Sequence, residues 1–448
     1  MLTKIKSIYL FLIFCGFAAN TEAASSEVTD FKQTWVAHTL KMQREIDINA
    51  PLNEATFIGT HNSENSVAYQ IPFVRYVDPN QQISIYNQLE MGVRSIELDV
   101  HWYADAHFSK DILLCHATSN HLGCSAFDKP VVEGLQELRD WLSMNPGEIV
   151  ILYFDKTLDG HEPRLASYLE GYLGSFIYKP SVVRNDNATP KSCISLPATL
   201  SKADILKAGK QLVVITKYCD TDAYQEQDQY KADWNDTVFA GIGNIKEQPY
   251  TMLDSSLDED FKPFPECSKH TTFNNDPLHS SVWRIFEDRT ILSSIIKPTR
   301  KIYSDEVKEL IRCGINWPTL DMLTMTDERL AAFVWSWAPN YPQNNNKACA
   351  IYKNGEGIEN VACSQTVAAY ACGNNITHEL KAIVAAGSWQ DGERMCQSIA
   401  GNTWHFATPI NGEQMYSFKE ATAALNLNEV WLNYRLESQG HWRANAVL

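Results

Sequence analysis

The chain is poor in basic residues, and past its first residues it lacks long apolar runs. Its 448 residues include 38 Lys and Arg against 54 Asp and Glu, a formal net charge of −16. This charge argues against nucleic acid as a partner and against broad adhesion to anionic membranes. After residue 23 no apolar run reaches the roughly 20 residues that a membrane-spanning helix needs. We therefore expect a soluble mature protein that supplies local cations to any anionic substrate.

The chain also lacks the Cys-x-x-Cys spacing of a zinc ribbon, which argues against that kind of metal site. Eleven cysteines are present. Cys15 falls within the first 23 residues, which we expect to be removed as a signal peptide. The remaining cysteines are even in number, which indicates disulfides in an exported protein. The spacing does not define the pairing. Proximity alone favours Cys115 with Cys124, and pairs among the last four cysteines.

The first 23 residues have the pattern of a secretory signal peptide. Lys4 and Lys6 precede an apolar stretch from Ile8 to Ala19, and Thr21-Glu22-Ala23 forms a small-residue cleavage site. The apolar stretch is shorter than a membrane anchor requires. The sequence therefore predicts a signal peptide at residues 1–23 and a secreted or periplasmic protein.

Eight short apolar runs predict strands that are buried on both faces, as in a parallel sheet. Helical patterns separate several of them, and their alternation indicates an α/β protein with an irregular (β/α)8 TIM barrel. The predicted strands are Thr56–Thr60, Val93–His101, Ile112–Ala117, Glu148–Asp155, Gln211–Lys217, Thr237–Gly243, Ile315–Asp321 and Ala332–Trp337. The predicted helices are Val131–Met144, Glu162–Leu173, Ser201–Ala208, Trp283–Ile296 and Asp305–Arg312, and Pro249–Asn275 is expected to be a long loop.

An Asn-rich stretch at 341–346 has the character of a linker. We therefore expect the barrel to occupy residues 24–340 and a small α+β domain to occupy residues 341–448. The order of motifs in the second domain resembles a C-type-lectin-like module, on the segments Ser388–Cys396, Trp404–Pro409 and Val430–Tyr434. The usual calcium-and-sugar tripeptides are absent, so a binding role and a capping role both remain open.

Polar side chains that can move protons or bind a cation follow the first predicted strands. His61 and Asn62 follow Thr56–Thr60, and His116 follows Ile112–Cys115. Glu97 and Asp99 lie two residues apart, so both project to one side of a strand. Two buried carboxylates repel each other and need a partner, for which a divalent cation is suited. Imidazoles with a pKa near ~6.5 and such a cation suit the cleavage of a phosphodiester.

These motifs resemble the X region of phosphatidylinositol-specific phospholipase C and, more broadly, the PLC-like phosphodiesterase superfamily, which has a TIM-barrel fold. The resemblance rests on His61-Asn62, on Gly-x-Arg-x-x-Glu-Leu-Asp at Gly92–Asp99, on His116 and on Asn145–Asp155. It is clear from Glu54 to Asp159 and weaker up to Ala338. The chain shows no pleckstrin, EF-hand or C2-type segment, which argues against a signalling phospholipase.

The resemblance implies a catalytic role for two residues and a cation-binding role for four. His61 would be the general base, or would hold the phosphate, and His116 would be the general acid. The residues that match the calcium ligands of the eukaryotic branch are Asn62, Glu97, Asp99 and Asp155. Bacterial members replace the metal with an arginine, but the acids at 97 and 99 favour a divalent cation here, Ca²⁺ or alternatively Mg²⁺.

Four further residues are candidate substrate contacts. Lys217 resembles a family lysine that contacts the substrate phosphate. Arg94 lies close to Glu97, with a structural role as the alternative. Asp321 would orient His61. Trp335 would stack on a ring or an acyl chain, with barrel packing as the alternative.

The sequence thus predicts an exported phosphoric diester hydrolase, like phosphatidylinositol-specific phospholipase C, that acts on a phospholipid or related phosphodiester with peripheral contact to a membrane. One alternative is a phosphodiesterase like sphingomyelinase D. The other is a secreted surface-binding protein whose barrel is a non-catalytic scaffold.

Overall fold

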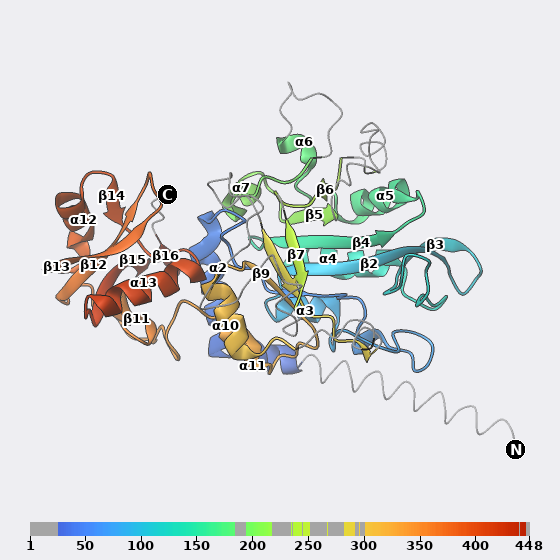
Figure 1. The fold of residues 1–448 in the computed structure, drawn as a ribbon, viewed down its shortest axis with the longest axis horizontal. Coiled ribbons are helices and arrows are strands. Elements are labelled where there is room, and N and C mark those ends of the chain that lie inside the picture. Colours follow the sequence, from blue (N-terminus) through green and yellow to red (C-terminus); the bar gives the residue numbers. More distant parts are fainter. Residues whose placement is uncertain are drawn as a thin grey trace, which may run out of the picture.

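The computed structural model contains two β-sheets with their associated helices (Figure 1). The structure describes residues 26–183, 194–216, 234, 236–243, 245–250, 267, 282–291, 295, 301–438 and 440–444. Within these residues, no helix combines the length and the apolar character needed to cross a bilayer.

The first sheet has nine strands and curls into an open, TIM-like half-barrel, called the barrel below. Its order is β6-β5-β4-β2-β1-β9-β8-β7, with every neighbour parallel, and β3 pairs antiparallel with β2. The strands are β1 (Gly59–Thr60), β2 (Ser95–Ala104), β3 (Lys110–Leu114), β4 (Val150–Thr157), β5 (Leu212–Thr216), β6 (Phe239–Ala240), β7 (Lys246–Pro249), β8 (Trp283–Phe286) and β9 (Trp317–Leu320). The parallel strands follow one another in chain order, as in a (β/α)8 barrel, so the predicted α/β class and TIM-like fold are confirmed.

Helices surround this sheet. They are α2 (Trp35–Ile46), α3 (Ile85–Glu90), α4 (Val131–Met144), α5 (Glu162–Leu173), α6 (Pro180–Val183), α7 (Lys202–Lys207), α10 (Ser304–Arg312) and α11 (Glu328–Ala332), with 3₁₀ turns η1 (Asp47–Asn49) and η2 (Val67–Tyr69). The bounds of α4 and α5 are those that the apolar spacing predicts. Helix α7 begins with a capping box, in which Ser201 and Asp204 satisfy each other's backbone amides.

Alternate residues of each strand enter two different hydrophobic cores. In β4, Leu152 and Phe154 belong to the core shared with the helices, whereas Ile151 and Tyr153 belong to the core inside the barrel. Trp317 of β9 is also part of the inner core. The same alternation turns the side chains of Glu97 and Asp99 in β2 towards the interior, because they flank Leu98 of the outer core.

Two predicted strands are not barrel strands. Ile112–Ala117 overlaps the last residues of β3, which is antiparallel because β2 continues to Ala104 and the chain then reverses. Ala332–Trp337 contains the end of α11 and the residues after it, and its tryptophans are buried in the core.

The predicted helix at Trp283–Ile296 begins instead with β8. Four strand residues are too few for their alternation to be separated from a helical pattern. Strand β7 was not predicted, and most of the predicted loop at Pro249–Asn275 lies outside the described residues.

The second sheet has seven strands and order β11-β10-β15-β12-β13, with β14 beside β12 and β16 beside β15. Its elements are β10 (Cys349–Lys353), β11 (Gly357–Val361), β12 (Val367–Asn374), β13 (Leu380–Gly387), η3 (Trp389–Asp391), α12 (Gly392–Ala400), β14 (Trp404–Phe406), α13 (Gly412–Ala424), β15 (Glu429–Leu436) and β16 (Trp442–Ala444). It shares a hydrophobic core with the barrel, where Trp337 packs on Tyr434 and Trp442. Asn411 also donates to Glu54, which precedes β1, so this sheet lies at the end of the barrel opposite the carboxyl ends of the strands (Figure 1).

Four disulfides join cysteines of the described chain. Cys115–Cys124 and pairs among the last four cysteines are confirmed, since the bonds are Cys115–Cys124, Cys267–Cys313, Cys349–Cys363 and Cys372–Cys396. Cys193 and Cys219 lie outside the described residues.

Candidate active site

The carboxyl ends of β1, β2, β4 and β9 meet at one rim of the barrel. Strand β1 pairs with both β2 and β9, and Asp99 lies opposite Asp155 in the pairing of β2 with β4. His61 directly follows β1, and Asp321 directly follows β9. Parallel strands therefore bring residues that are distant in the sequence to one edge.

His116 reaches this rim by a different route. The hairpin of β2 and β3 extends beyond the barrel and returns, so that Cys115 N donates to Asp99 O (2.9 Å). His116 follows at once, and its ring centroid lies 6.5 Å from that of His61. The disulfide between Cys115 and Cys124 closes the loop that contains His116. The two histidines are thus neighbours, although β3 is not a barrel strand.

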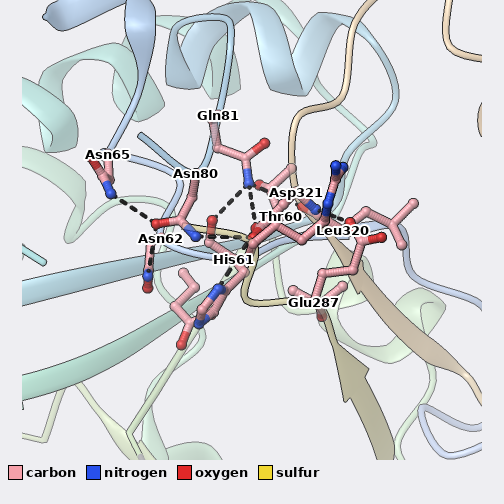
Figure 2. A network of polar contacts seen from close by, with 12 residues as sticks. Thr60, His61, Asn62, Asn65, Asn80, Gln81, Glu287, Leu320 and Asp321 are labelled. Carbon is pink, nitrogen blue, oxygen red and sulfur yellow. Dashed lines mark hydrogen bonds and ion pairs between the residues drawn. The ribbon is translucent and has the colours of Figure 1, made fainter. Parts of the chain in front are cut away.

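His61 lies between two carboxylates. Its Nε2 is 4.0 Å from Glu97 Oε2. Its Nδ1 is 3.7 Å from Oδ1 of Asp321 (Figure 2). Burial alone would lower the pKa of His61, but these two acids raise it to about 9. Burial and the charge of His61 lower the pKa of His116. One ring therefore holds its proton more tightly than the other.

Three carboxylates form a cluster that could hold a cation. Glu97, Asp99 and Asp155 each place an oxygen within 4.8 Å of the others; the first two are buried and Asp155 is exposed. Burial, together with Glu64 nearby, raises the pKa of Asp99 well above its usual range. Asp99 Oδ1 is buried without a hydrogen-bond partner among the described residues. This unsatisfied oxygen and the crowded charges fit a hard divalent ion.

Sequence reasoning missed Arg284, which enters the same group from β8. Its guanidinium pairs with Glu97 and donates to Glu247 (2.9 Å), and it stacks 4.9 Å from the Tyr153 ring centroid. Burial would lower the pKa of Arg284, but Glu97 and Glu247 raise it. Glu97 is consequently shared between this arginine, His61 and any cation. The four residues of β8, among which Arg284 is the one charged residue, are too few to define a strand pattern in the sequence.

A buried ion pair holds Asp321 in place. Glu287 accepts from Asp321 N (2.6 Å) and from Arg329 Nη1 (3.0 Å), and Arg329 Nη2 donates to Asp321 O (2.8 Å). Burial raises the pKa of Glu287 to about 7, although Arg329 opposes this. No sequence pattern marks Glu287 or Arg329, because their contacts with Asp321 form only where the loops after β8 and β9 meet.

Two predicted substrate contacts lie elsewhere. Arg94 is at the opposite end of β2, where it donates to Glu148 (2.9 Å) and lines a cavity of about 630 Å³ beside α2 and α4. Trp335 is buried in the core, and its backbone amide donates to Gln43 Oε1 (2.9 Å). The structure therefore does not place Arg94 or Trp335 with the rim residues. Lys217 lies outside the described residues.

A parallel barrel with paired histidines and carboxylates at its carboxyl rim has the architecture of a PLC-like phosphodiesterase. Comparison with known families gives the same class. Residues 18–327, more than half of the chain, match the model of the Rv2075c PI-PLC-like domain, and the chain belongs to this family.

Several individual proteins are similar to this chain. Rv2075c of Mycobacterium tuberculosis is 28% identical over 381 residues, which cover 80% of this chain and 70% of that protein. The PI-PLC X domain-containing protein At5g67130 of Arabidopsis thaliana is 35% identical over 126 residues, 28% of each chain. Among solved structures, a phosphatidylinositol-specific phospholipase C of Staphylococcus aureus superposes with a TM-score of 0.38 and 14% identity, over 65% of this chain and 95% of that one.

Proposed function

We propose that this protein is a phosphoric diester hydrolase of the phospholipase C type, which cleaves a phospholipid or related phosphodiester by acid–base catalysis with His61 and His116. Family membership supports the class of reaction. The observation that carries the proposal is the pair of imidazoles, 6.5 Å apart between ring centroids, beside a buried cluster of carboxylates. A purely structural barrel has no need of these groups at one rim.

The two histidines would divide the proton transfers. His61 would take the proton of the attacking hydroxyl, and Asp321 beside its Nδ1 would hold the ring and stabilise the imidazolium. His116 would give a proton to the leaving oxygen. Since Glu97 is the acid that raises the pKa of His61 most, sharing the Glu97 charge with a cation would free His61 to act as the base.

Asn62, Glu97, Asp99 and Asp155 would hold a divalent cation, Ca²⁺ or Mg²⁺. When bound, such an ion stabilises charge on the phosphoryl oxygens and lowers the pKa of the attacking hydroxyl. The chain's own residues would do the rest: Asp99 and Asp155 would anchor the ion, Asn62 would add a neutral oxygen, and Arg284 would stabilise the charged form of Glu97.

Exposed apolar side chains on loops at the same rim support a lipid substrate and peripheral contact with a membrane. Phe73 is 98% exposed, and Phe108, at the tip of the hairpin, is 94% exposed. Phe127 and Ile291 are exposed too, and their loops are joined to the segment of Phe73 through Arg75 and Asp78. Such side chains bury apolar area on entering a lipid interface.

We also propose that residues 1–23 are removed as a signal peptide and that the protein is secreted or periplasmic. The disulfides support an oxidising compartment. The second sheet lies away from the rim, which supports a capping role for residues 341–448, while the likeness to a C-type-lectin-like module stays a prediction.

Hydrolysis of a chromogenic phosphodiester and of phospholipid vesicles, with products identified by mass, tests the proposal. His61→Ala and His116→Ala should each lower kcat by about 10²–10⁴-fold, because each removes one proton transfer. His405→Ala, in the second sheet, is the matched control and should leave kcat unchanged. A chelator should abolish turnover, and added Ca²⁺ should restore it.

The products also separate the alternatives. Release of a phosphorylated headgroup supports a phospholipase C. Release of a free headgroup alcohol supports a sphingomyelinase D-like reaction. Full turnover in both histidine variants would overturn their catalytic roles, whereas no turnover by the wild-type protein would support a non-catalytic barrel.

A further inference from the structure

Asn80 connects three parts of the candidate site through one side chain. It comes from the irregular segment between η2 and α3, where no sequence pattern marks it, and it is fully buried. Its Oδ1 accepts hydrogen bonds from the side-chain amides of Asn62 (3.1 Å) and Asn65 (2.8 Å). Its Nδ2 donates to Asp321 Oδ2 (3.0 Å), as Figure 2 shows.

The backbone of Asn80 makes a parallel connection. Its N donates to Asn65 O (2.8 Å), and its O accepts from Met322 N (2.7 Å). Asn62 and Met322 both have left-handed backbones, with φ of 44° and 55°. Sharp bends therefore follow β1 and β9, and Asn80 joins the loop that carries His61 to the loop that carries Asp321.

Asp321 determines the direction of these hydrogen bonds. Its Oδ2 accepts from Arg289 N (2.7 Å) as well as from Asn80, so Asn80 turns its amino group to Asp321 and its oxygen to the other two amides. Asn62 must then present its amino group to Asn80, which leaves Asn62 Oδ1 facing away. That oxygen is the atom a cation would bind.

The same arrangement reaches His116. Asn65 Nδ2, held by Asn80 Oδ1 and by Asp78 O (2.9 Å), lies 3.4 Å from His116 Nδ1. The side chain of Asn80 is thus connected to each imidazole through one intervening residue. Asp321 connects it to His61, and Asn65 connects it to His116.

We propose that Asn80 is a positioning residue, which sets the orientation of Asn62 towards the cation and of Asp321 beside His61. The inference rests on the proposed function and adds to it a residue that touches neither substrate nor cation. Outer partners of this kind hold ligands and catalytic groups in their working orientation.

Two substitutions separate the two connections. Asn80→Ala removes both, so kcat should fall about 10–100-fold with KM changed less than about threefold, and the affinity for Ca²⁺ measured by calorimetry should fall about tenfold. Asn80→Asp keeps the oxygen that faces Asn62 but loses the donor to Asp321. It should therefore keep the Ca²⁺ affinity within about threefold of the wild type while kcat falls as in the alanine variant.

Asn360→Ala is the control for a merely structural role. Asn360 is also buried and makes several hydrogen bonds, but in the second sheet. It should lower the melting temperature and leave kcat and Ca²⁺ affinity unchanged. If Asn80→Ala behaves in the same way, the proposal is overturned.

A failure of the proposed function would be visible separately, as a wild-type protein that hydrolyses no phosphodiester. The imidazole signals of His61 and His116 in ¹⁵N-histidine NMR spectra then decide the question without activity. Asn80→Ala should shift the signals of both rings, and Asn360→Ala should shift neither. Unshifted signals in Asn80→Ala would overturn the positioning role.

Discussion

Arg284 pairs with Glu97 inside the barrel, on the same face of β2 as Asp99. Both partners are buried, so removal of the guanidinium takes away the counter-charge that Arg284 supplies to Glu97. Arg284→Gln should lower the free energy of unfolding by about 3–5 kcal/mol, measured by urea denaturation. It should also raise the affinity for Ca²⁺, because Glu97 becomes available to the ion.

Arg139→Gln is the matched control, since its ion pair with Asp140 is exposed and worth less than about 1 kcal/mol. A lower Ca²⁺ affinity in Arg284→Gln would show that Glu97 does not serve the cation. Arg284→Lys keeps a charge and provides a milder variant for the binding measurement.

The proton on His61 should respond to Glu97. In the cation-free protein the pKa of His61 is raised from 6.5 to about 9. Protonation of His61 therefore contributes stability that is fully present below pH 6.5 and is lost as the pH rises through about 9. An NMR titration, assigned with His61→Ala, should show this pKa, and Glu97→Gln should lower it. An identical pKa in Glu97→Gln would contradict the electrostatic explanation.

Arg94 should matter for stability and not for catalysis. Its guanidinium donates to Glu148 and lies 4.6 Å from the Trp141 ring centroid. The two arginines Arg44 and Arg94 hold the pKa of Glu148 well below its usual range, although burial opposes them. Arg94→Ala should therefore lower the free energy of unfolding by about 2–4 kcal/mol. Assayed well below its melting temperature, the variant should keep the kcat and the Ca²⁺ affinity of the wild type. A loss of either would support the prediction that Arg94 contacts the substrate.

Gly412, the first residue of α13, should not tolerate a side chain. A Cβ there would lie 2.1 Å from Ile311 Cγ2, next to Trp335, where the second sheet's helix meets α10. Gly412→Ala should cost about 1–3 kcal/mol through overpacking, seen as a lower melting temperature of the full chain. Gly171→Ala, in open space on α5, is the control and should stabilise by about 0.5–1 kcal/mol. Equal melting temperatures for the two variants would mean that the contact between α13 and α10 accommodates the added methyl group without a loss of stability.

Some site residues could be predicted because local patterns carry them. His61, Glu97 and Asp155 are polar residues in or just after apolar runs, and the barrel rule places them at one rim. The same reasoning misplaced Arg94, since a strand motif does not reveal which residues lie at its buried far end. His116 was predicted at the rim through a parallel strand, whereas an antiparallel hairpin brings it there.

Other residues could not be found from sequence. Arg284 acts on Glu97 only through the register of β8 against β9, and the four residues of β8 are too few to define a period. Asn80 lies in a loop without periodicity, and its role depends on three loops that meet in space. Contacts of this kind belong to the tertiary structure and leave no trace in local spacing.

In the hairpin of β2 and β3, Val100 pairs with Leu114 at the barrel end and Ala104 pairs with Lys110 near the tip. The position of His116 therefore does not depend on how far the hairpin extends beyond the barrel. Residues added or removed in matched pairs near the tip would leave the attachment at Asp99 unaltered. An unmatched change in one arm would slide the ladder by a step and turn alternate side chains to the other face. Natural variants of this protein can therefore have a longer or shorter hairpin outside the barrel without displacing the His116 imidazole, provided that both strands change by the same number of residues.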